Sequence, residues 1–113
     1  MHAQERRRRR SEDSVEAVAL LLEACRERTG LDALVIADRD GMLVSASTRP
    51  GVEPELIAAH LPRTHLREQV PELHARTFKA HGIRLFLGAV GGMSERMVGE
   101  LLHAMRSAQR ILG

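Results

Sequence analysis

The sequence is poor in aromatic residues and contains no long apolar run. Tryptophan and tyrosine are absent, and Phe78 and Phe86 are the only aromatic residues in a chain of 113. A core must therefore be built from Leu, Val, Ile, Ala and Met, and the 43% of hydrophobic residues is enough for one modest domain. No apolar stretch approaches the roughly 20 residues that a membrane-spanning helix needs. The basic N-terminus also lacks the apolar segment of a signal peptide.

Cysteine is nearly absent too. Cys25 is the only one, so an internal disulfide is excluded. It falls on the apolar face of an expected helix, where a buried and inert thiol is the simpler interpretation. No histidine lies near it in the sequence, which argues against a cysteine nucleophile. These features predict a protein of the reducing cytoplasm.

Positive charge is concentrated near the N-terminus. The formal net charge is +2, and five of the 17 Lys and Arg residues stand together. They are Arg6, Arg7, Arg8, Arg9 and Arg10. Without this run the chain has fewer basic than acidic residues, which argues against a broad nucleic-acid surface on the folded part.

The arginine run has two interpretations. Because like charges repel, residues 1–12 are expected to form a disordered basic tail, and residues 13–113 the domain. The tail is either a solvated segment that aids solubility or an electrostatic contact to nucleic acid or to an anionic lipid surface. No aromatic residue interleaves with the arginines, so base stacking is not supported.

An Asp-Gly turn between two apolar runs organises the first half of the chain. Residues 33–37 and 42–46 are apolar, and Asp38, Asp40 and Gly41 lie between them. This pattern predicts a β-hairpin, because glycine takes a positive φ without a Cβ clash. Paired aspartates can act as a catalytic acid and base. At a turn, however, they normally hydrogen-bond the local backbone, and we interpret them as turn residues.

Three helices are expected from apolar periodicity and capping residues. The first starts among residues 11–14 and runs to about Thr29. The second covers residues 53–61, with Leu56, Ile57 and Leu61 on one side. The third follows Ser94 and runs to about residue 112, at the end of the chain.

The second half of the chain contains another predicted hairpin. Residues 73–80 alternate in polarity, His81 and Gly82 form a turn, and residues 83–90 are strongly apolar. Residues 63–72 are polar and interrupted by Pro71, which suits either a separate helical turn or an exposed loop. The order helix, hairpin, helix, hairpin, helix predicts an α/β (α+β) sandwich. In it a mostly antiparallel sheet carries the N- and C-terminal helices on one face and the short middle helix on the other.

No motif for catalysis or cofactor binding stands out. Residues 88–92 are rich in glycine but lack the spacing and the Lys-Ser/Thr ending of a phosphate-binding loop. The six histidines do not cluster at metal-ligand spacing. We therefore expect no cofactor, no metal site and no enzymatic activity.

The first hairpin is specific enough to suggest a family. Residues 31–47 resemble the opening hairpin of the Roadblock/dynein light chain family, in which a small-apolar strand, Asp-x-Asp-Gly and a strand ending in small residues follow one another. Gly30 after an amphipathic helix fits, as does the passage 85–112, so the resemblance covers about residues 13–112. Other profilin-like, longin-like and sensory domains share a similar hairpin. The family usually has five strands, so either a short strand hides in residues 63–70 or this chain is a trimmed variant.

The resemblance implies a bacterial, non-catalytic homodimer or heterodimer whose sheets join. It also implies a small Ras-like GTPase as partner, because bacterial relatives often regulate one, sometimes by remodelling the active site of the GTPase. We place the dimer or partner contact on the middle helix. The residues chosen are Glu53, Leu56, Ile57, His60 and Leu61. The alternatives are a self-assembling structural subunit, and an adaptor that binds nucleic acid or membrane through the arginine run.

Overall fold

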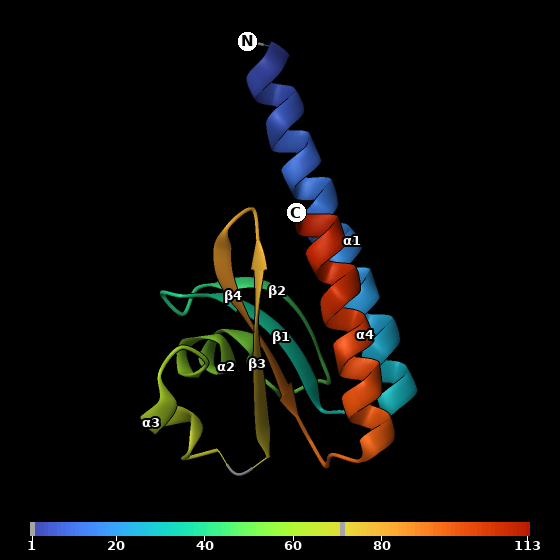
Figure 1. Ribbon diagram of the computed structural model, residues 1–113, viewed down its shortest axis with the longest axis vertical. Helices are drawn as coiled ribbons and strands as arrows, with labels where there is room; N and C mark the ends of the chain where they lie inside the picture. The colour runs from blue at the N-terminus through green and yellow to red at the C-terminus, as the bar shows by residue number, and fades with distance from the viewer. Residues whose placement is uncertain (1, 71) are drawn as a thin grey trace.

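The chain forms one antiparallel sheet between two helical layers (Figure 1). The computed structural model describes the backbone of residues 2–70 and 72–113, and the side chains of residues 12–70 and 72–113. The elements are α1 (His2–Thr29), β1 (Ala33–Asp38), β2 (Leu43–Thr48), α2 (Pro54–His60), α3 (Thr64–Arg67), β3 (Leu73–Ala80), β4 (Ile83–Val90) and α4 (Glu95–Leu112).

The strand order is β2-β1-β4-β3, and every neighbouring pair is antiparallel. Helices α1 and α4 lie side by side against one face, while α2 and α3 lie on the other (Figure 1). This arrangement confirms the predicted sandwich. It also leaves two edges, β2 and β3, on opposite sides of the sheet.

Strand β1 is central and buried on both faces. Leu34 and Ile36 belong to the core shared with α1 and α4. Ala33, Val35 and Ala37 belong to a smaller core under α2. The run of apolar residues without alternation is typical of a strand covered on both sides.

Both predicted hairpins are confirmed, and their turns explain why they form. Asp38 and the backbone of Met42 close the first turn, where Gly41 has a φ of 82°. His81 and Gly82 form the second turn with φ values of 52° and 73°. Two consecutive positive φ values are typical of the two-residue turn whose twist matches that of the flanking strands.

One expectation differs from the structure, and one question left open by the sequence is decided. Helix α1 begins at His2 and not among residues 11–14, in a segment of Arg, Glu and Gln residues that have high intrinsic helix propensity. The division into a tail, 1–12, and a domain, 13–113, stays a prediction. No strand forms in residues 63–70, where the short helix α3 lies instead. The four-stranded alternative is therefore the observed one for the described residues.

Candidate protein-interaction site

The middle helix separates the predicted contact residues into exposed and buried ones. Leu56 is 58% exposed, and Glu53 is also exposed at the N-cap of α2. Ile57 and His60 are half-buried, and Leu61 has no exposed surface. The structure therefore brings Glu53 and Leu56 to the surface and uses Leu61 inside the protein.

The expectation that Leu56, Ile57 and Leu61 share one side of the helix is wrong. Ile57 and Leu61 are four residues apart and both contact the core under α2. Leu56 and Leu61 are five residues apart, which is about 140° around a helix. Leu56 consequently points away from the sheet. His60 is positioned by its Nδ1, which lies 2.6 Å from the carbonyl oxygen of Leu56.

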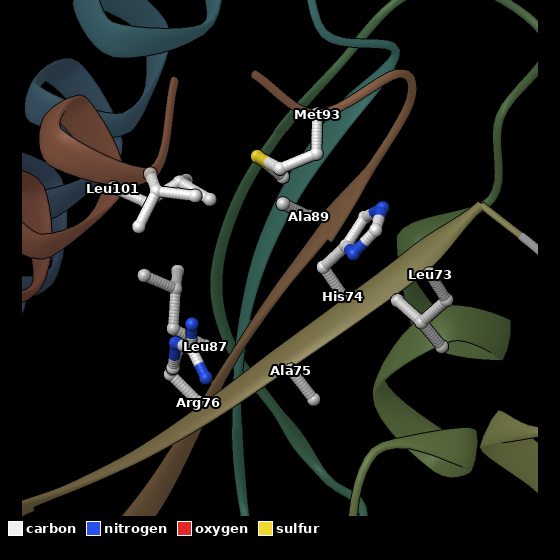
Figure 2. A pocket seen from close by; sticks show the side chains of 9 residues that line it. Leu73, His74, Ala75, Arg76, Leu87, Ala89, Met93 and Leu101 are labelled. Atoms are coloured by element: carbon white, nitrogen blue, oxygen red, sulfur yellow. The ribbon is translucent and has the colours of Figure 1, made fainter. Parts of the chain in front are cut away.

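A second candidate surface lies along the edge strand β3. A hollow of about 280 Å³ opens between β3 and α4. Its lining comprises Leu73, His74, Ala75, Arg76, Leu87, Ala89, Met93, Val98 and Leu101. Figure 2 shows His74 and Arg76 on the α4 side of β3, facing this mostly apolar floor, while Leu73 and Ala75 point to the opposite side of the strand.

The opposite side of β3 has a hollow of its own. It measures about 330 Å³ and is open to solvent. Thr64, Arg67, Glu68, Val70, Leu73 and Ala75 line it. The guanidinium of Arg67 is held there by the hydroxyl of Thr64 at 3.0 Å. The edge of β3 thus separates two hollows that share Leu73 and Ala75.

A third hollow, of about 310 Å³, lies between α1 and β2. Leu20, which is 61% exposed, is on its rim. Arg26 crosses it and donates from Nε to the hydroxyl of Ser47 at 2.9 Å. This contact joins α1 to the second edge strand and reduces access to it.

The side chains that were weighed as possible reactive groups have structural roles. Oδ1 of Asp38 accepts hydrogen bonds from the backbone N–H of Asp40 at 2.9 Å and of Met42 at 3.0 Å. The interpretation of Asp38 as a turn residue is therefore confirmed. Cys25 is fully buried, and burial raises the pKa of its thiol; the nearby Arg28 lowers that pKa and Glu100 raises it further. Among the side chains of residues 12–70 and 72–113, no three His, Cys, Asp or Glu are grouped to hold a metal ion.

The β3 surface has a signal in the sequence, although a weak one. His74, Arg76, Phe78 and Ala80 point to the same side of β3, and only Phe78 and Ala80 are buried in the core with α4. Polar residues in the first half of a strand face, followed by apolar ones, indicate that the covering helix leaves that half open. The other predicted contact, the arginine run at residues 6–10, has its side chains outside the described part of the chain.

Across the described residues, no helix combines the length and apolarity needed to cross a bilayer.

No family model matches the chain, and no curated protein matches it. A solved structure, Myxococcus xanthus MglB, is similar to it with a TM-score of 0.53 at 10% sequence identity. The match covers 87% of this chain and 86% of that one. The four-stranded antiparallel sheet with its flanking helices matches the roadblock fold of MglB, and this chain therefore has the roadblock fold.

Proposed function

We propose that this protein is a non-catalytic, dimeric module that binds and regulates a small Ras-like GTPase. The observation that carries the proposal is the likeness to MglB over 87% of the chain, since MglB is a roadblock-domain GTPase regulator. A cytoplasmic, bacterial setting is part of the same proposal. The low identity means that the residues in contact with the partner must be argued from this chain alone.

The chemistry of the described residues supports a regulator without an active site of its own. Asp38 is engaged in its turn, and Cys25 is a buried thiol whose pKa is raised by burial. A protein of this kind changes the rate of a reaction by stabilising one conformation of its partner's catalytic groups.

We assign the dimer contact to the outer side of α2. Leu56 is a large apolar side chain that is more than half exposed, and it lies between Glu53 and His60 on a short helix. An exposed apolar centre with a polar surround is the usual composition of a protein contact. Leu61 supports this surface from beneath, because it fixes α2 to the sheet.

The test uses two exposed leucines. Leu56→Glu should convert a dimer into a monomer in sedimentation velocity, because a charge is then buried in the contact. Leu20→Glu, on α1, is the matched control, since Leu20 is exposed to 61% and Leu56 to 58%. A dimer that survives Leu56→Glu would contradict the assignment to α2.

The regulatory role has its own measurement. Phosphate release is followed for the small Ras-like GTPases of the source genome, each with and without this protein in excess. We expect one of them to bind it in the GTP-loaded state and to change its rate. Absence of both binding and rate change across the set removes the proposal, and large concentration-dependent oligomers would favour a self-assembling structural subunit.

A further inference from the structure

The edge strand β3 presents a regular row of backbone groups to solvent. The carbonyl oxygen of Glu72 accepts from the N–H of Gly91 at 3.1 Å, on the β4 side. Hydrogen-bonded pairs alternate along an antiparallel ladder, so the backbone groups of Leu73, Ala75, Thr77 and Lys79 point away from β4. The N–H of Leu73 already donates to the carbonyl oxygen of Val70 at 3.1 Å. Gln109 donates to the outward carbonyl of Lys79 at 2.7 Å, which confirms this direction. The carbonyl of Leu73 and the N–H and C=O groups of Ala75 and Thr77 are the remaining outward groups of residues 73–77.

The two edges of the sheet differ. Strand β3 has eight residues and pairs with β4 without a shift in register. Strand β2 has six residues, its pairing with β1 is irregular at Ile36 and Ala37, and α1 contacts it through Ser45 and Ser47. An irregular and short edge is a poor template for another strand, whereas a regular one is a good template.

Hollows lie on both faces of the sheet at this edge. The first extends from β3 to α4 over the side chains of Leu87 and Leu101. The second is on the face that carries Leu73 and Ala75, beside α3. Because successive side chains of a strand point to opposite faces, a strand added to β3 would place alternate side chains in the two hollows.

The charge of this edge is positive. Arg76 and Lys79 are exposed on β3, and Arg67 lines the second hollow. Lys79 is directly opposite Arg84 in the ladder, and like charges in that position are destabilising. The ion pairs found among the described residues, Arg28 with Glu100 and Arg49 with Asp32, include none of these four. Glu68 and Glu72 are the acidic residues nearby.

We propose that the free edge of β3 binds an extended, acidic and apolar segment of a partner protein as an added strand. Backbone hydrogen bonds to residues 73–77 supply affinity. An apolar side chain on one face fills the hollow over Leu87 and Leu101, and acidic side chains on the other face contact Arg67 and Lys79. This mode of recognition combines main-chain pairing with pockets for alternate side chains. It goes beyond the proposed function, because it concerns a surface other than the outer side of α2 and does not depend on a GTPase.

A charged edge strand can also have a protective or a self-pairing role. Exposed lysine and arginine on an edge strand can serve only to prevent aggregation. A second copy of the chain could also pair with β3, but the contact would then bring the positive side chains of both copies together. An acidic segment meets attraction at the same positions, and the experiment below separates the three roles.

The probe is a labelled heptapeptide with alternating acidic and apolar residues, Glu-Leu-Glu-Val-Glu-Leu-Glu, and binding is followed by fluorescence anisotropy. The charge-reversed peptide with lysine in place of glutamate is its control. We expect the acidic peptide to bind with a Kd below 1 mM and at least tenfold more tightly than the basic one. Its binding should weaken as the salt concentration is raised.

Two threonines provide matched backbone variants. Thr77 is at an outward position of β3, and Thr48 is at the corresponding kind of position on β2, since its neighbour Arg49 donates inward to Asp32 at 3.0 Å. Proline at an outward edge position removes a free N–H without breaking a ladder bond. Thr77→Pro should weaken binding of the acidic peptide at least tenfold, and Thr48→Pro should leave the Kd of that peptide unchanged.

The charge is tested separately on the full chain. Lys79→Glu should weaken binding of the acidic peptide at least tenfold and strengthen binding of the basic peptide. Arg39→Glu, in the exposed β1–β2 turn, should alter neither by more than twofold. Circular dichroism and urea unfolding establish that each variant is folded.

Three results would overturn the proposal. The first is no binding of the acidic peptide at 1 mM to the folded parent protein. The second is binding that Thr77→Pro and Thr48→Pro weaken equally. The third is a dimer of the parent protein that Thr77→Pro dissociates and Thr48→Pro does not, because β3 would then be occupied by a second copy.

Discussion

Leu61 lies directly on the backbone of Gly88, at the point where the end of α2 meets strand β4. A Cβ atom added to Gly88 would be 2.5 Å from Cδ2 and 3.1 Å from Cδ1 of Leu61. Leu61 is fully buried, together with Ala58 and Val35. The close approach of α2 to the sheet therefore depends on a glycine in the strand.

Gly88→Ala is expected to destabilise the protein by about 1–3 kcal/mol, because an extra methyl group overpacks this contact. The measurement is the free energy of unfolding in urea. Gly99→Ala is the control, since a Cβ at Gly99 meets nothing within 4 Å, and alanine is favoured over glycine in a helix. Equal destabilisation by the two substitutions would contradict the expectation.

Leu61→Ala completes a double-mutant cycle with Gly88→Ala. Alone it should cost about 2–5 kcal/mol, since a buried leucine is replaced by a cavity. In the double variant the new methyl group of Ala at position 88 occupies part of that cavity. The double variant should therefore lose at least ~1 kcal/mol less than the sum of the single losses. Simple additivity would show that the two positions do not contact each other.

The two aspartates of the first turn should differ. Asp38→Ala removes the acceptor for the N–H groups of Asp40 and Met42 and should lower the free energy of unfolding by about 1–2 kcal/mol. Asp40→Ala removes an exposed side chain and should change it by less than about 0.5 kcal/mol. Thermal or urea unfolding of the two variants provides the comparison. Equal losses would indicate that the carboxylate of Asp40 also has a partner.

The strands were predictable because their signals are local. An Asp-Gly turn and a His-Gly turn specify positive φ values at fixed positions, and the predicted runs 73–80 and 83–90 have the bounds of β3 and β4. Residues 63–70 could be narrowed only to a helical turn or a loop, because their few apolar residues follow no clear period, and the helical turn is the one observed. The part of α1 before residue 11 was missed because a run of like charges indicates disorder, while arginine itself favours a helix.

The two candidate contact surfaces, on α2 and beside β3, could not be predicted, because they depend on distances between elements that are far apart in the sequence. The exposure of Leu56 and the burial of Leu61 follow from the way α2 packs against β1 and β2, with Leu61 over Gly88 of β4. The hollow beside β3 follows from the separation between α4 and the first half of that strand. Both are set by tertiary packing, and the sequence gives only the polarity of the residues involved.

Cys25 should be unreactive in the folded protein. Its side chain has no exposed surface, and burial raises the pKa of the thiol above the ordinary value of 9.0. Few thiolates are then available at neutral pH, and reagents reach them only when the helix opens. The rate of reaction with a disulfide reagent should therefore rise by orders of magnitude when urea unfolds the protein. Rapid labelling without urea would show that α1 separates from α4 in the folded state.

The thiol of Cys25 should also make the free energy of unfolding depend on pH. A pKa raised by folding means that the folded state holds the proton more tightly, so the stabilisation is present below pH 9.0 and is lost as the pH rises through the folded pKa. Tyrosine is absent and Lys79 is the only lysine, so few other groups titrate there. Urea unfolding between about pH 8 and pH 10.5 should show a decline that Cys25→Ala removes.

The arginine run is tested by deletion. The first fully buried side chain of α1 among the described residues is Val18, so removal of residues 1–12 should leave the free energy of unfolding within about 1 kcal/mol of that of the full chain. A larger loss would contradict a boundary between tail and domain at residue 12. Binding of the full chain to anionic vesicles or to single-stranded nucleic acid is measured in parallel at low and at physiological salt. An adaptor role predicts binding that falls with salt and disappears with the deletion, whereas a solubility segment predicts no binding and a deletion variant that precipitates at lower concentration.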